Sequence, residues 1–196
     1  MEKNKVASVI LAGGGAKRMG YPKPLLMWKG KPILVHLVEA SREAKLCPIL
    51  IISGAYHQDI QQVIREFPVE LIYNPNWEKG QSTSVAAAIA ALPTETEAAI
   101  FLLADQPFIP VKLLTMLSDT FKHTHAAVIA PYVGKQRGNP LLFSREVFPQ
   151  LTQLTGDQGG RALLGKYQIT QVVWDDERIL FDVDTPEDYQ RLLLME

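Results

Sequence analysis

Cysteine is almost absent from this sequence: among 196 residues there is only Cys47. A single thiol cannot form an internal disulfide, so a small secreted fold held together by disulfides is excluded. Cys47 precedes Pro48 and has no histidine close to it in the sequence, which is typical of a packed residue and not of a nucleophile. The sequence also lacks a long apolar segment of the kind found in signal peptides and membrane spans. We therefore expect a protein of the reducing cytoplasm.

Charge of one sign is not in excess either. Lys and Arg number 20 against 21 Asp and Glu, which leaves a net charge of −1. Such a balance creates no field that would attract a nucleic-acid backbone or an anionic membrane. Aromatic residues make up 8% of the chain and are too scattered to form a platform for stacked bases. We expect no nucleic-acid partner and no membrane partner, but a small-molecule ligand.

Short apolar runs alternate with helical patterns along the chain, and the content of 47% hydrophobic residues is sufficient for one well-buried core. Runs typical of strands buried on both faces occupy residues 6–11, 49–52, 69–73, 98–103 and 126–130. Helical patterns, several of which begin with proline or a hydroxyl residue, occupy residues 32–44, 56–66, 82–92 and 110–121. Further strands are expected at 138–143 and 169–174, and further helices at 157–164 and 185–194. This alternation predicts a single α/β domain over residues 1–196, a three-layer α/β/α sandwich with a mostly parallel sheet and one antiparallel strand in its second half.

A glycine loop with three cations follows the first expected strand, where residues 9–23 read VILAGGGAKRMGYPK. A dinucleotide-binding fingerprint would need glycine at Arg18, and a Walker-type loop would need lysine and a hydroxyl at Tyr21 and Pro22. Neither motif is therefore present in this loop. The backbone N–H groups of the loop can still surround an anion, with Arg18 and Lys23 adding positive charge. We interpret the loop as a triphosphate site; the alternative is a tight turn with solvated cations.

Ligands of open α/β sheets bind beyond the carboxyl ends of the strands, so residues that follow the apolar runs are further candidates. Gln81, Ser82 and Ser84 begin an expected helix and offer short hydrogen-bonding groups to a base or phosphate. The alternative for these residues is an ordinary helix N-cap. Asp105 ends a buried strand, where a carboxylate is costly without a cation nearby. It is therefore the best metal-ligand candidate.

A second acidic motif, FDVDTPED, occupies residues 181–188. In an extended chain Asp182 and Asp184 share one face. Either carboxylate could join Asp105 on Mg²⁺, which takes one or two protein carboxylates beside substrate phosphates. The alternative is that Asp184 or Thr185 caps the last helix.

The segments LAGGGAKRMG with Lys23 downstream, LADQP and DVDTPED resemble the signatures of the MobA-like NTP transferases, the molybdenum cofactor nucleotidyltransferase family. The resemblance extends from residue 6 to about residue 194 and implies a Rossmann-like nucleotidyltransferase fold. It implies catalytic roles for Arg18, Lys23 and Asp105, and a metal held by Asp105 and Asp184, with Asp182 as the other candidate. Together with the residues proposed above, it suggests that the nucleotide is bound by Leu11, Ala12, Gly13, Gly14, Gly15, Arg18, Lys23, Gln81, Ser82 and Ser84.

Three further segments resemble the cytidylyltransferase branch of that family, and the resemblance places Gly138, Asn139, Pro140, Asp157 and Arg161 on the acceptor side. Asn139 stands where that branch usually has histidine, and LAGG is more typical of the guanylyl branch. The resemblance implies Mg²⁺-dependent transfer of CMP from CTP to the terminal phosphate of molybdopterin, with release of pyrophosphate, and a molybdoenzyme or its maturation chaperone as protein partner. Alternatives are GTP on the same acceptor, a sugar- or polyol-phosphate acceptor, and a non-catalytic nucleotide-binding chaperone that delivers the cofactor.

Overall fold

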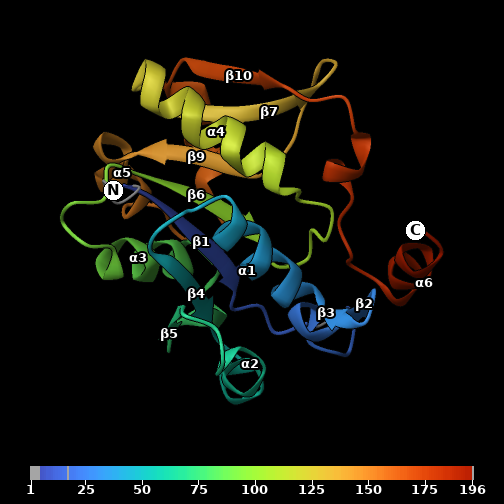
Figure 1. The fold of residues 1–196 in the computed structure, drawn as a ribbon. Helices are drawn as coiled ribbons and strands as arrows, with labels where there is room; N and C mark the ends of the chain where they lie inside the picture. Colours follow the sequence, from blue (N-terminus) through green and yellow to red (C-terminus); the bar gives the residue numbers. More distant parts are fainter. Residues whose placement is uncertain (1–4, 17, 196) are drawn as a thin grey trace.

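One eight-stranded sheet forms the centre of the protein, as the computed structural model shows for residues 5–16 and 18–195 (Figure 1). Its strands are β1 (Val6–Ala12), β4 (Ile49–Ser53), β5 (Glu70–Tyr73), β6 (Ala98–Leu103), β7 (Val128–Val133), β8 (Gln136–Arg137), β9 (Leu141–Ser144) and β10 (Ile169–Val173). They lie in the order β10-β7-β9-β6-β1-β4-β5, with β8 paired to β7. β9 is antiparallel to both of its neighbours and β8 is antiparallel to β7, whereas the other pairs are parallel.

Helices cover both faces of this sheet because its central strands are apolar on both sides. They are α1 (Ile33–Glu43), α2 (His57–Ile64), α3 (Gln81–Ala91), α4 (Val111–Thr124) and the short α5 (Phe148–Leu151). One core cluster joins the sheet to α1, α2 and α4, and a second joins its other face to α3 and α5. The three-layer α/β/α sandwich that the sequence predicts, with its mostly parallel sheet, is therefore confirmed.

The last helix, α6 (Pro186–Leu194), lies apart from these layers, beside a hairpin of β2 (Met27–Trp28) and β3 (Lys31–Pro32) (Figure 1). A third, small core joins the two ends of the chain there, through Met19, Leu26, Ile33, Val183 and Leu192. The Tyr189 hydroxyl also donates a hydrogen bond of 2.8 Å to the carbonyl oxygen of Met27. The small core, through Val183 and Met19, brings the segment before α6 close to the loop after β1.

Two elements of the second half differ from the expectation. The helix expected at residues 157–164 is a 3₁₀ segment, η4 (Gly160–Lys166), because glycines around it disfavour an α-helix. The strand expected at 138–143 begins only at Leu141, since Pro140 has no N–H to contribute to the ladder. In residues 5–16 and 18–195, no helix has both the length and the apolar character needed to cross a membrane.

Candidate functional site

A cavity of about 650 Å³ opens at the carboxyl ends of β1 and β6. These two strands are parallel neighbours in the centre of the sheet, so the loops that follow them start side by side. The cavity extends over the face covered by α3, where Phe101, Leu141 and Phe143 form its apolar floor. Nearly all of the polar candidates from the sequence line it: Arg18, Lys23, Gln81, Ser84, Asp105, Asn139, Asp157, Arg161, Asp182 and Asp184.

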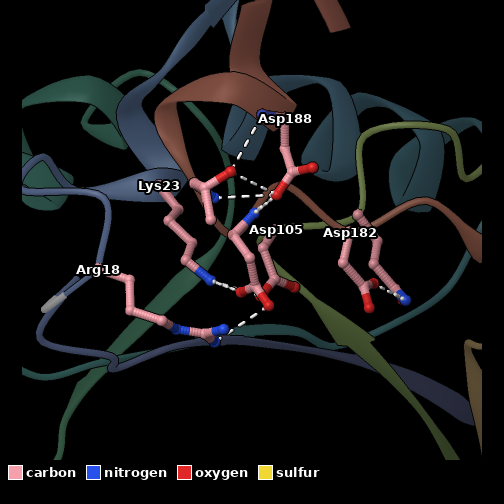
Figure 2. Close-up of polar contacts among 8 residues, drawn as sticks. Arg18, Lys23, Asp105, Asp182 and Asp188 are labelled. Carbon is pink, nitrogen blue, oxygen red and sulfur yellow. Dashed lines mark hydrogen bonds and ion pairs between the residues drawn. The ribbon is translucent and has the colours of Figure 1, made fainter. Parts of the chain in front are cut away.

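Lys23 joins two of the candidate carboxylates. Its Nζ lies 3.2 Å from Asp105 Oδ2 and also donates a hydrogen bond to Asp184 Oδ1 (Figure 2). Arg18 adds a second cation, with Nη2 3.0 Å from Asp184 Oδ2. A carboxylate at the end of β6 and another before α6 therefore converge on one positive charge.

These contacts shift the pKa values of Lys23 and Asp184. Burial opposes the charge on Lys23, but the hydrogen bond to Asp184 and the charge of Asp105 outweigh it and raise the Lys23 pKa. The hydrogen bond from Lys23 lowers the pKa of Asp184 more than its partial burial raises it. At neutral pH the cluster therefore holds a charged Lys23 ammonium beside a charged Asp184 carboxylate.

Thr185, and not Asp184, caps α6. Its Oγ1 accepts a hydrogen bond of 3.2 Å from the backbone N–H of Asp188, whose Oδ2 accepts one of 3.0 Å from the Thr185 N–H. This reciprocal pair is a capping box, which satisfies the free N–H groups of the first turn. The Asp184 side chain is thus left to face Lys23 and Arg18.

Asp182 lies in the same cavity wall but has a different partner. The Gln106 amide donates a hydrogen bond of 2.6 Å to Asp182 Oδ1 (Figure 2). Burial raises the pKa of Asp182, although the bond from Gln106 opposes that shift. The Gln106 amide oxygen is buried and has no hydrogen-bond partner among the described residues. Gln106 was not expected from the sequence, although it stands next to Asp105 in LADQP.

The donor set at this point fits a hard divalent cation. Asp105 and Asp184 both reach the single Nζ of Lys23, so one ion at a similar position is within range of two carboxylate oxygens. The described part of the chain has no cluster of three or more His, Cys, Asp or Glu that could hold a metal. An ion bound by these two carboxylates would take its remaining oxygen ligands from water and from substrate phosphates, as Mg²⁺ commonly does.

The glycine loop is packed tightly on the β1 side of the cavity, where Leu11, Ala12, Gly13, Gly14 and Gly15 line the wall. A Cβ on Gly15 would lie 2.8 Å from Trp77 Cζ3, and a Cβ on Gly54 would lie 2.4 Å from the Gly13 carbonyl oxygen. Glycine is required at both positions because backbone and indole leave no space for a side chain. Trp77, which was not expected from the sequence, also lines the cavity. Its only signal in the sequence is its place among turn-forming residues in NPNWEKG.

The start of α3 contributes two of the three residues expected from the sequence. Gln81 and Ser84 line the cavity. Ser82 does not line the cavity; it is buried, and its backbone N–H donates a hydrogen bond of 3.1 Å to the Gly156 carbonyl. Asn74, another residue not singled out from the sequence, donates from its amide to Ser84 Oγ at 3.0 Å. This hydrogen bond therefore fixes the position of Ser84, which lines the cavity.

Of the acceptor-side candidates, Asn139, Asp157 and Arg161 line the cavity, whereas Gly138 and Pro140 lie behind its wall. A Cβ on Gly138 would lie 2.9 Å from Ile179 Cδ1, so this residue faces the opposite side of the sheet. Pro140 is buried. Neither residue lines the cavity, and their contact with the acceptor stays a prediction.

Known proteins resemble this chain over nearly its full length. A nicotine blue oxidoreductase of Paenarthrobacter nicotinovorans is 27% identical, and the match covers 96% of both chains. The purine catabolism protein PucB of Bacillus subtilis is 28% identical over 96% of both chains. The molybdenum cofactor cytidylyltransferase of Escherichia coli is 24% identical over 92% of both chains.

Solved structures share the fold. The crystal structure of Rv0371c from Mycobacterium tuberculosis H37Rv superposes with a TM-score of 0.89 at 26% identity, covering 99% of this chain and 100% of that one. A complex of Rv0371c with manganese gives a TM-score of 0.85 at 24% identity, covering 97% and 99% of the two chains. The family model of the MobA-like NTP transferase domain matches residues 8–172, which contain the glycine loop and Asp105. This chain therefore belongs to the MobA-like NTP transferase family.

Proposed function

We propose that this protein transfers a nucleotidyl group from a nucleoside triphosphate to the terminal phosphate of molybdopterin and releases pyrophosphate. The observation that carries this proposal is the convergence of Asp105 and Asp184 on Lys23 beside the glycine loop. The arrangement places a divalent-cation donor set and two basic side chains next to N–H groups able to bind phosphate. The similarity to a cytidylyltransferase acting in molybdenum cofactor synthesis supports the choice of acceptor.

The reaction needs positioning and charge compensation more than proton transfer. The phosphate monoester of molybdopterin is already anionic at pH 7, so its oxygen attacks the α-phosphorus without a general base. One P–O bond forms there, and the bond from the α-phosphorus to the bridging oxygen of the β-phosphate breaks. Arg18, Lys23 and the loop N–H groups stabilise the negative charge on the leaving pyrophosphate. Mg²⁺, held by Asp105 and Asp184, supplies positive charge at the phosphate oxygens when bound.

Mg²⁺ is proposed as the physiological ion and Mn²⁺ as its experimental substitute. Both are hard cations that prefer oxygen ligands. The manganese complex of Rv0371c supports the use of Mn²⁺ as a spectroscopic probe of this site.

CTP is the proposed nucleotide and GTP the alternative. The residues at the start of α3 and the acceptor-side segments resemble the cytidylyl branch, whereas the LAGG of the first loop resembles the guanylyl branch. A site selects a base by pairing its polar groups with one edge pattern, which leaves them unpaired against another base. Gln81 and Ser84 face the cavity and are the side chains proposed to read that edge.

Hydride transfer is not proposed, despite the relative named as an oxidoreductase. Arg18 stands where the dinucleotide fingerprint needs its last glycine, which in that fingerprint allows the helix to pack closely on the strand. Instead, the guanidinium of Arg18 reaches Asp184. We propose a cytoplasmic reaction whose product passes to a molybdoenzyme or its maturation chaperone.

Pyrophosphate release, measured with CTP, GTP, ATP and UTP in turn and with or without molybdopterin, tests the proposal. We expect release only when acceptor and nucleotide are both present, with the highest kcat/KM for CTP. A clear preference for GTP would select the alternative nucleotide, and turnover with a sugar or polyol phosphate instead of molybdopterin would select the alternative acceptor. Nucleotide binding without pyrophosphate release under any condition would favour the non-catalytic chaperone.

A further inference from the structure

Arg137 lies two residues before Asn139, which lines the cavity, although Arg137 itself is not among the lining residues. It is the second residue of β8 and pairs with Tyr132 near the end of β7. β10 occupies one edge of β7, so β8 and β9 must share its other edge, which faces β6. Arg137 is therefore at the carboxyl-end edge of the sheet, on the same side of β7 as the strand that ends at Asp105.

The direction of the Arg137 side chain follows from its neighbour. The backbone N–H of Gly138 donates a hydrogen bond of 2.8 Å to the Pro131 carbonyl, and a Cβ on Gly138 would point at Ile179 and Leu180, on the face covered by α4. Successive residues of an extended segment face opposite sides. Arg137 and Asn139 consequently share the other face, on which Asn139 lines the cavity.

The guanidinium of Arg137 has an unused donor. Its Nε is buried and has no hydrogen-bond partner among the described residues, and the ion pairs of that part of the chain do not include Arg137. A buried N–H of a charged group without an acceptor costs free energy. A buried charged group with an unpaired donor calls for an explanation. A ligand phosphate that reaches the Arg137 guanidinium from the neighbouring cavity would supply an acceptor.

The order of the strands separates the two substrates of a transfer reaction. The glycine loop follows β1 on one side of β6, and β9 with the preceding Arg137 lies on the other side. Asp105, at the end of β6, stands between them. Triphosphate bound by the loop and a second phosphate bound on the β9 side would thus meet at the carboxylates.

We propose that Arg137 binds the reacting phosphate monoester of the acceptor, an inference that rests on the proposed function. Arg18 and Lys23 come from the loop after β1 and pair with Asp184 and Asp105, so a cation on the β9 side would serve the dianionic acceptor phosphate. A guanidinium suits this task because its parallel N–H groups match two phosphate oxygens and it remains charged at any physiological pH. Arg137 is in this view an acceptor-binding residue that holds the attacking oxygen in position.

Binding of two fluorescent pterins tests this inference without relying on turnover. One pterin carries an alkyl phosphate monoester and the other is its dephosphorylated counterpart; Kd values are measured by fluorescence titration with Mn²⁺ and CTP present. We expect wild-type protein to bind the phosphorylated pterin about tenfold more tightly or better, as a charged hydrogen bond provides. In Arg137→Gln this ratio should fall close to one, and in Arg137→Lys it should be intermediate. The Kd of Mn²⁺–CTP should stay unchanged in both variants.

Lys135→Gln is the matched control, because Lys135 is an exposed cation in the same hairpin and its replacement removes the same charge. This variant should keep the wild-type ratio. An Arg137→Gln protein that also keeps this ratio would overturn the inference, as would equal weakening for both pterins, which indicates a packing role. Wild-type protein that distinguishes the pterins but releases no pyrophosphate with molybdopterin would contradict the proposed function alone. Failure to distinguish them would overturn this inference, whereas pyrophosphate release with molybdopterin would then still support the proposed function.

Discussion

The backbone N–H of Val183 donates a hydrogen bond of 2.9 Å to the carbonyl oxygen of Asp105. This bond attaches the segment before α6 to the end of β6, and it places Asp182 and Asp184 on either side of the residue that faces Asp105. The buried Val183 side chain also packs into the small core with Met19 and Leu26. The position of the carboxyl-terminal aspartates is therefore determined by backbone pairing and apolar packing, independently of the charges that they carry.

The two carboxylates that share Lys23 should be the ones essential for turnover. We expect Asp105→Asn and Asp184→Asn each to lower kcat at least ~100-fold, the scale for loss of one preorganised electrostatic contact, and to weaken Mn²⁺ binding measured by electron paramagnetic resonance. Asp182→Asn should have a smaller effect, because Gln106 and not Lys23 is its partner. Asp119→Asn on α4 serves as control. A larger loss at Asp182 than at Asp184 would move the second ligand to Asp182.

Nucleotide affinity should depend on the two cations of the first loop. Arg18→Ala and Lys23→Ala should each weaken triphosphate binding by roughly 1.5–3 kcal/mol, the range for hydrogen bonds between charged groups. Isothermal titration with a non-hydrolysable CTP analogue measures this change. Lys122→Ala, which removes an exposed cation paired with Asp119 on α4, should bind as wild type. Unchanged affinity in both loop variants would mean that their charges are solvated and do not touch the nucleotide.

Asp182 should make the folded state less stable at neutral pH. Burial raises the pKa of Asp182 above its ordinary value, so the folded protein holds that proton more tightly than the unfolded chain does. Its contribution to stability consequently falls as pH rises from the pKa of the unfolded chain through the folded pKa. At pH 7, Asp182→Asn should leave Tm unchanged or higher, and the difference from wild type should shrink toward acid pH. A markedly lower Tm at pH 7 would contradict this sign.

Asp184 should act in the opposite direction. The hydrogen bond from Lys23 lowers its pKa below 3.8, so its stabilising contribution is present above that value and is lost as pH falls through the folded pKa. Asp184→Asn should therefore lower Tm at pH 7, and the deficit should vanish in acid. Thermal unfolding of both variants across pH provides the comparison, with Asp119→Asn as the common control.

Gly54 should be irreplaceable for a steric reason. A Cβ there would lie 2.4 Å from the Gly13 carbonyl oxygen and 2.7 Å from Trp77, so Gly54→Ala must displace the glycine loop. We expect the free energy of unfolding in urea to fall by ~1–3 kcal/mol, as for overpacking elsewhere, together with weaker nucleotide binding. Gly165→Ala is the control, since a Cβ there meets nothing within 4 Å. Equal stability of the two variants would show that the loop adapts freely.

Much of the fold is determined by local patterns in the sequence. The apolar run of residues 98–103 is β6 with the same bounds, because six consecutive apolar residues with sheet neighbours on both sides can be buried only in the centre of a sheet. The glycine loop, Asp105 and Asp184 were identifiable as well, since each directly follows or precedes such an element. The predicted bounds of elements differ from the observed ones where glycine and proline interrupt the pattern, as at η4 and before Leu141.

Only the tertiary structure decided which of these residues meet. Lys23 contacts Asp105 across 82 positions and Asp184 across 161, and no local periodicity encodes contacts of that range. The structure also separated Asp184 from the helix cap, turned Gly138 away from the cavity and brought Trp77 against Gly15. The physical reason is that strand order, register and packing, which arise from the whole chain, set the direction of each side chain, whereas the sequence by itself determines which chemical groups stand at the strand ends.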